Sequence, residues 1–205
     1  SVTSSVMQFE YDRKFINLLD TPGHADFSED TYRTLTAVDS ALMVIDVAKG
    51  VEERTLKLMD VCRLRTTPII TFINKLDREG KEAIDLLDEI ETELKIKCVP
   101  LTWPIGMGAR LIGIYNLMDN SIRIYNKDNK LDHSVIIKDI KSNEAKEKLK
   151  DTYDTFIEEI ELIKGVYEEF DKNKYLSGTH TPVFFGTALH NFGISEFLGC
   201  LAEHA

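Results

Sequence analysis

The chain has 205 residues, 43% of them hydrophobic, and its 35 acidic and 25 basic side chains give a formal net charge of −10. This length allows one substantial core, or one core with an insertion. The negative charge argues against a general basic groove for nucleic acid. The sequence contains no signal peptide, no apolar stretch long enough to cross a bilayer and no lipidation motif, so we expect a cytoplasmic protein without membrane or DNA partners. Its three cysteines, Cys62, Cys98 and Cys200, lie far apart without metal-ligand spacing, which favours buried, reduced thiols.

The first predicted strand is the mostly apolar run from Lys14 to Leu19, which ends in Asp20-Thr21-Pro22-Gly23-His24. An aspartate at a strand end can hold Mg²⁺, directly or through water, and a glycine just beyond it lets a backbone N–H approach a terminal phosphate. The alternative is a plain β-turn, because Pro and Gly are common in turns. A second nucleotide motif at another strand end favours the phosphate interpretation.

The run from Ala41 to Asp46 shows no alternation, as expected for a strand covered on both faces. A helix-like segment from Glu52 to Arg65 follows, and then the apolar run Pro68 to Ile73. Strand, helix and strand in this order are typical of a parallel sheet flanked by helices. Ligands of such sheets bind at the carboxyl ends of the strands.

Asn74-Lys75-Leu76-Asp77 stands at that position and is consistent with a guanine-recognition loop. An ionised Asp77 can accept hydrogen bonds from both N1–H and the N2 amino group of guanine, a pair of donors that adenine lacks. The Lys75 stem can cover a base or ribose face, and Asn74 can tie neighbouring loops together. Alone, the tetrapeptide is a weak signal, because it also suits an ordinary strand-to-helix turn.

The segment between residues 111 and 179 is predicted to form an inserted subdomain, with the core at 1–110 and 180–205. After a helix-like stretch from Glu82 to Lys95, Gly113 to Ile140 alternates like short antiparallel strands. One long acidic helix is expected next, with its apolar side chains at helical spacing: Leu149, Tyr153, Phe156, Ile160 and Ile163. The carboxylates Glu158, Glu159 and Glu161 form either a solvated face, the favoured interpretation, or a contact for a basic protein.

The last predicted strand is Pro182 to Gly186, followed by Thr187-Ala188-Leu189 and a helix around Ile194 to Leu201. The backbone N–H of Ala188 is placed to meet guanine O6. This gives a third loop at the same edge of the sheet.

With these three motifs in this order and spacing, the chain resembles the GTPase domain of translational GTPases, most closely the release factor 3 branch. The resemblance runs from Ser1 essentially to Ala205. The stretches that favour release factor 3 over elongation factor G are residues 27–39, 101–106 and 182–189. The resemblance implies an α/β fold with a mostly parallel sheet of the P-loop NTPase type flanked by helices, and a small α+β insertion.

The resemblance also implies a function, namely GTP hydrolysis on the ribosome during translation termination, with ribosomal RNA, ribosomal proteins and class-I release factors as partners. His24 would be the catalytic residue, and Asp20 and Ser1 would hold Mg²⁺. The nucleotide, GTP or GDP, would contact three groups of residues: Asp20, Thr21, Pro22, Gly23 and His24; Asn74, Lys75 and Asp77; and Thr187, Ala188 and Leu189. Two alternatives stay open, a translocation GTPase like elongation factor G and a non-catalytic interaction module.

No G-x-x-x-x-G-K-[ST] phosphate loop occurs in the sequence, although the family carries one before the point that matches Ser1. The expectation is therefore a piece truncated at its amino end, without the phosphate loop and the first strand. That strand would lie between those at Phe15 to Leu19 and Leu42 to Asp46. We expect such a piece to be native-like, weakened and inactive on its own.

Overall fold

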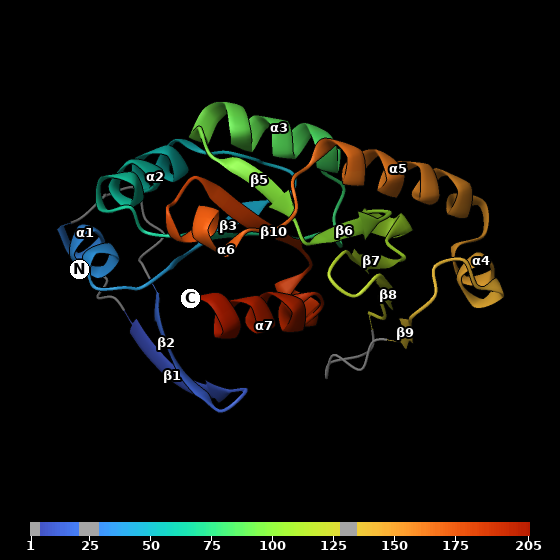
Figure 1. Cartoon of the computed structure of the whole chain (residues 1–205), viewed down its shortest axis with the longest axis horizontal. Helices are drawn as coiled ribbons and strands as arrows, with labels where there is room; N and C mark the ends of the chain where they lie inside the picture. The colour runs from blue at the N-terminus through green and yellow to red at the C-terminus, as the bar shows by residue number, and fades with distance from the viewer. Residues whose placement is uncertain (1–4, 21–28, 128–134) are drawn as a thin grey trace.

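The computed structural model describes residues 5–20, 29–127 and 135–205, which form three sheets and the helices around them. Figure 1 shows a central parallel sheet with α2 and α3 on one side and α7 on the other, and a second, smaller sheet beside it. This is the predicted α/β fold with an additional α+β part.

The central sheet has the strand order β3-β4-β10-β5, and every neighbouring pair is parallel. Its strands are β3 (Ala41–Asp46), β4 (Ile69–Asn74), β5 (Lys97–Pro100) and β10 (His180–Phe185). The predictions for β3, β4 and β10 are confirmed to within two residues, whereas β5 was not predicted. Its four residues are too few to show a period against their surroundings.

Side chains of β4 point alternately to two cores. Ile69 and Ile73 pack with the helices α2 (Glu53–Arg65) and α3 (Ala83–Leu94), whereas Ile70 and Phe72 pack with α7 (Ile194–His204). A strand buried on both faces has a continuous apolar run, which explains why β4 was predictable from sequence.

The expectation that β3 is also covered on both faces is wrong. Ile45 is buried, but Val44 next to it is 54% exposed. Within the described residues β3 pairs with β4 alone, so it is an edge strand and part of its surface lacks cover.

The second sheet is antiparallel, with the strand order β6-β7-β8-β9. Its strands are β6 (Thr102–Ile105), β7 (Gly113–Asn116), β8 (Ser121–Ile124) and β9 (Val135–Ile137). The antiparallel strands predicted between residues 113 and 140 are confirmed. The sheet begins at Thr102, however, ahead of the expected domain boundary at residue 111. A short 3₁₀ turn, η1 (Gly108–Arg110), connects β6 to β7.

The long acidic helix is interrupted, contrary to the prediction. It consists of α4 (Asn143–Leu149), the 3₁₀ turn η2 (Lys150–Thr152) and α5 (Tyr153–Val166). Lys150 has a φ of +48°, which no α-helix continues through. The apolar spacing holds on both sides of the break, so the pattern alone did not reveal it.

A third, separate sheet is a hairpin of β1 (Ser5–Tyr11) and β2 (Lys14–Asp20). Its two turn residues, Asp12 and Arg13, both have positive φ, as a tight two-residue hairpin requires. The hairpin contacts α7, because the Tyr11 hydroxyl donates to the Ser195 carbonyl at 3.3 Å and the Lys14 ammonium donates to the Ala202 carbonyl. Among the described residues it shares no strand pairing with the central sheet.

Three short elements complete the chain: α1 (Glu29–Thr36), α6 (Lys172–Leu176) and the 3₁₀ turn η3 (Ala188–His190). The part of the chain that the structure describes contains no helix with the length and apolarity needed to cross a membrane.

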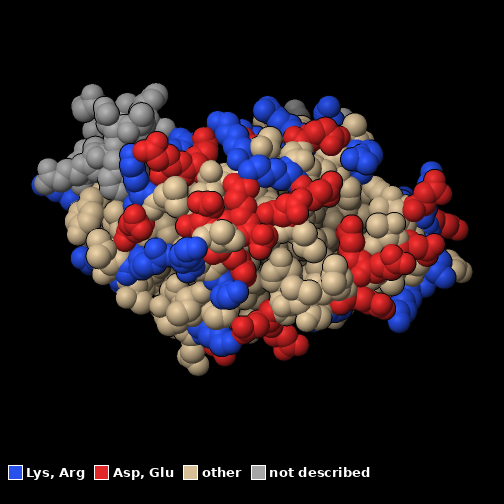
Figure 2. All heavy atoms as spheres, turned by 90° about the horizontal axis from the view of Figure 1, so that it is seen from above, with Lys and Arg blue, Asp and Glu red and all other residues tan. Residues whose placement is uncertain are grey.

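One face of the molecule is acidic. In Figure 2 Asp and Glu side chains gather across the middle of the face on which α3 lies. This helix carries Asp85, Asp88, Glu89, Glu91 and Glu93 and no Lys or Arg. The observation supports the argument from net charge against a basic groove on this face.

Candidate functional site

The candidate site lies where β3, β4 and β10 end. Parallel pairing sets Asp46 opposite Asn74, and Phe185 opposite Ile73. The loops after the three strands therefore leave the sheet at the same edge, which is where open α/β sheets bind ligands. The structure thus brings together the 74–77 and 187–189 motifs, as predicted.

Asn74 joins the two loops. Its side-chain oxygen accepts hydrogen bonds from the Lys75 N–H at 2.8 Å and from the Ala188 N–H at 2.9 Å. A further bond runs from the Leu76 N–H to the Gly186 carbonyl at 3.1 Å. The expected role of Asn74 in tying loops together is what the structure shows.

The hydrogen bond between Asn74 and Ala188 changes the expected role of Ala188. Its N–H is engaged by Asn74, whereas the sequence placed it opposite guanine O6. The Leu189 N–H has no partner among the described residues, and the Leu189 side chain is 76% exposed. Leu189 therefore offers the open backbone donor of this loop.

Lys75 is held by Asp46, a contact that the sequence did not reveal. The Lys75 Nζ lies 2.6 Å from the Asp46 Oδ2, and the Asp46 Oδ1 accepts from the Ala48 N–H at 2.9 Å. The hydrogen bond from Lys75 lowers the pKa of Asp46, and the N–H groups of Ala48 and Lys49 add to this effect against the opposing effect of desolvation. The ion pair holds the end of the Lys75 side chain at the carboxyl end of β3.

Asp77 has a buried carboxylate oxygen that no described residue satisfies. The side chain is 17% exposed, and its Oδ1 is buried without a hydrogen-bond partner in the described part of the chain. The buried Thr187 hydroxyl is likewise without a partner there. Leaving a buried acceptor unpaired costs free energy, roughly 1–3 kcal/mol or more for a charged group. A ligand edge that donates two hydrogen bonds fits this carboxylate, and guanine has such an edge.

Two residues near Asp77 were missed by sequence reasoning. His190 Nε2 lies 3.8 Å from the Asp77 Oδ2, and the ring of Tyr125 packs edge-on against His190 with 6.0 Å between centroids. His190 follows Leu189 directly, so its position in the loop was a usable signal. Tyr125 comes from the end of β8, and nothing in the sequence connects it to this site.

The phosphate side of the site is not assembled by the described residues. Asp20 ends β2 and is exposed, while Ser1, Thr21, Pro22, Gly23 and His24 lie outside the described residues. In Figure 1 β2 ends near α1, whereas β3 and β10 end toward β6 and the start of α7. Among the described residues, no strand pairing joins the hairpin that ends in Asp20 to the central sheet, so nothing in this part of the structure places Asp20 beside Asp77. The described residues also contain no group of three or more His, Cys, Asp or Glu suited to a metal ion.

A cavity of about 660 Å³ lies elsewhere, between α2, α3 and the loop that precedes β10. Its lining includes Arg63, Asp88, Glu91 and Lys97, and none of the residues assigned to the nucleotide. Its charged groups are partly paired with one another, as in the 3.0 Å bond from Lys97 to Glu91. It therefore does not alter the assignment of the site.

The model of the elongation factor Tu GTP-binding domain matches residues 1–205. The chain belongs to this family. The family lies among the translational GTPases and binds GTP, which agrees with the unpaired Asp77 carboxylate oxygen. The fold is also similar to the crystal structure of a protein from Thermus thermophilus, with a TM-score of 0.74 and 19% identity over 98% of this chain. The match covers 32% of that protein, so this GTP-binding domain spans about a third of its length.

Proposed function

We propose that the protein hydrolyses GTP on the ribosome during translation termination and promotes the release and recycling of class-I peptide chain release factors. The observation that carries the nucleotide assignment is the unpaired Asp77 Oδ1, in a loop that Asn74 ties to residues 187–189. The termination role is supported by the likeness of residues 27–39, 101–106 and 182–189 to release factor 3.

Different residues of the site bind different parts of the base. Asp77 accepts from N1–H and the N2 amino group, and the Leu189 N–H donates to O6. The apolar stem of Lys75, held at its tip by Asp46, lies against the base or ribose. The contacts of Asp77 favour guanine over adenine, because adenine has an acceptor at N1 and no N2 amine.

Hydrolysis would depend on residues near the other motif. Asp20 and Ser1 would hold Mg²⁺ through oxygen atoms, the donors that this ion prefers. Bound Mg²⁺ neutralises negative charge on the phosphates. The Gly23 N–H would bond the γ-phosphate, and His24 would orient the attacking water.

Substitution of Asp77 tests the nucleotide assignment. In the full-length protein we expect D77N to lose roughly a hundredfold in GDP affinity, since two hydrogen bonds to a charged acceptor are weakened. D77N should gain affinity for xanthosine diphosphate, because the side-chain amide introduced by the substitution can donate to the O2 that replaces the amine. Titration of fluorescent nucleotides measures both, and unchanged GDP affinity in D77N would rule out the assignment.

The termination role is tested on ribosomes that carry a labelled class-I release factor after peptide release. The full-length protein with GTP should accelerate loss of the label, and H24A should abolish ribosome-stimulated turnover while retaining GDP affinity. Acceleration of tRNA translocation in place of factor release would favour the elongation-factor-G alternative. Binding without any turnover would favour the interaction module.

A further inference from the structure

His190 lies between Asp77 and Tyr125 and so links the two main sheets of the molecule. His190 belongs to η3, directly after β10, and Tyr125 directly follows β8 of the second sheet. The Tyr125 backbone N–H donates to the Ile112 carbonyl at 2.8 Å, which fixes its place at the end of that sheet.

The ring of His190 is held on one edge by aromatic packing. Tyr125 lies 6.0 Å from His190 with an interplanar angle of 72°, and 5.2 Å from Phe192 with an angle of 63°. Such edge-on pairs stabilise one orientation of the rings. His190 is 17% exposed, so its ring has little freedom to turn toward solvent.

This orientation presents Nε2 to Asp77. Nε2 lies 3.8 Å from Oδ2, which is longer than a hydrogen bond but close enough for an N–H dipole to act on a shielded carboxylate. The other oxygen, Oδ1, is buried and unpaired in the described residues. The imidazole thus lies beside Oδ2 and leaves the buried Oδ1 without a partner among the described residues.

We propose that His190, braced by Tyr125, is a positioning residue that sets the plane of the Asp77 carboxylate so that both oxygens meet a guanine edge. The proposal rests on the proposed nucleotide function. A variant without the His190 side chain should discriminate less between bases that donate two hydrogen bonds and bases that donate one. A carboxylate that is free to turn keeps one hydrogen bond to the base more easily than two. Guanine and hypoxanthine measure this directly, since hypoxanthine keeps N1–H and O6 but lacks the N2 amine.

The experiment compares GDP with inosine diphosphate in the full-length protein. We expect the ratio of the two dissociation constants to fall roughly fivefold in H190A, the factor that corresponds to about 1 kcal/mol for one hydrogen bond. H190Q should restore the ratio, because its side-chain amide can donate from a similar position. N191G is the matched control in the same turn, since Asn191 has a φ of +51° that glycine adopts freely.

A second pair of variants tests the brace without touching His190. Y125L should reproduce the loss of discrimination, and Y125F, which keeps the ring, should not. This pair also keeps the proposal testable when H190A fails to fold.

The possible results distinguish the positioning role of His190 from the proposed binding of guanine nucleotides. A native protein that prefers GDP over inosine diphosphate, with the same ratio in H190A and Y125L, would overturn the role of His190 alone. A native protein that binds no guanine nucleotide would overturn the proposed function and this inference together. Equal losses of affinity for both nucleotides in H190A would indicate general destabilisation of the loop and also overturn the positioning role.

Discussion

Asp46 shows how a side chain at the end of one strand can hold a side chain that follows the neighbouring strand. The Asp46 carboxylate binds the Lys75 ammonium at 2.6 Å. Lys75 itself has a φ of +72°, which is uncommon outside glycine. Sequence alone identified Lys75 as a residue of the motif but gave no indication of its partner, because 29 positions separate the two side chains.

The Asp46–Lys75 pair predicts a contribution to stability that is lost in acid. The hydrogen bond from Lys75 holds the pKa of Asp46 below its ordinary value of 3.8, so the unfolded chain binds this proton at a higher pH than the folded chain does. The stabilisation is therefore fully present above about pH 5 and disappears as the pH falls through the lowered pKa of the folded state. We expect the difference in unfolding free energy between the native protein and D46N to be constant from about pH 5 to 7 and to shrink below about pH 4. Urea titrations across this range measure it, and a difference independent of pH would contradict the prediction.

Strands and helices were predictable where their apolar side chains follow one another or recur at a regular spacing. The helices α2, α3 and α7 and the strands β3, β4 and β10 each present an apolar run or stripe that the sequence displays. The break at Lys150 was not predictable, because it depends on a single backbone angle. The pairing of β1 with β2 was not predictable either, because it depends on a two-residue turn. At the site, Asn74 and Asp77 were found by their motif, whereas Tyr125 is brought there only by the packing of distant elements.

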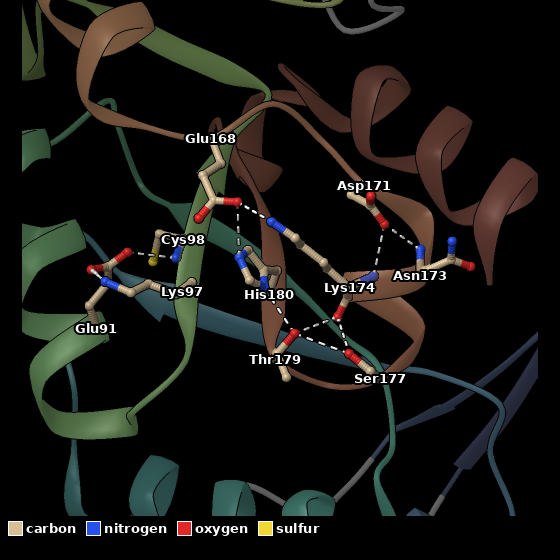
Figure 3. A network of polar contacts seen from close by, with 10 residues as sticks. All are labelled: Glu91, Lys97, Cys98, Glu168, Asp171, Asn173, Lys174, Ser177, Thr179 and His180. Atoms are coloured by element: carbon tan, nitrogen blue, oxygen red, sulfur yellow. Dashed lines mark hydrogen bonds and ion pairs between the residues drawn. The ribbon is translucent and has the colours of Figure 1, made fainter.

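Glu91 is the side chain that fastens the start of β5 to α3. Figure 3 shows it next to Lys97 and Cys98, and its two oxygens accept from the Cys98 N–H at 2.9 Å and the Lys97 Nζ at 3.0 Å. The edge strand β5 is only four residues long, so each such contact matters for its position.

Removing the Glu91 carboxylate should weaken the attachment of β5 to α3. We expect E91A to lower the free energy of unfolding by about 1–3 kcal/mol, because the partly buried Cys98 N–H loses its acceptor. E91Q keeps an acceptor oxygen and should lose less. Chemical denaturation gives the stabilities, and amide exchange at Cys98 should accelerate in E91A. Equal stability of all three proteins would show that solvent replaces the carboxylate without cost.

At the scale of the molecule, the two main sheets share one core. Trp103 of β6 packs edge-on against Phe185 of β10 at 5.6 Å between centroids, and the buried Thr102 hydroxyl accepts from the Phe185 N–H at 2.8 Å. β6 lies ahead of the proposed boundary at residue 111 and already belongs to the second sheet.

Because the hydrogen bond between Thr102 and Phe185 joins the two sheets, we expect them to unfold together. T102V keeps the shape but removes the acceptor, and should cost about 1–3 kcal/mol, whereas T102S should be close to the native protein. Fluorescence of Trp103, the one tryptophan of the chain, and far-ultraviolet circular dichroism should report the same midpoint in each protein. Separate midpoints would show that the sheets unfold independently.

The bridge that Asn74 makes between the loops after β4 and β10 has a consequence for the thermodynamics of association. Because those loops are already fastened to each other, the conformational entropy of arranging them is lost when the chain folds and not when a base arrives. Capture of the base would then resemble insertion into a preorganised slot, with little rearrangement of the main chain.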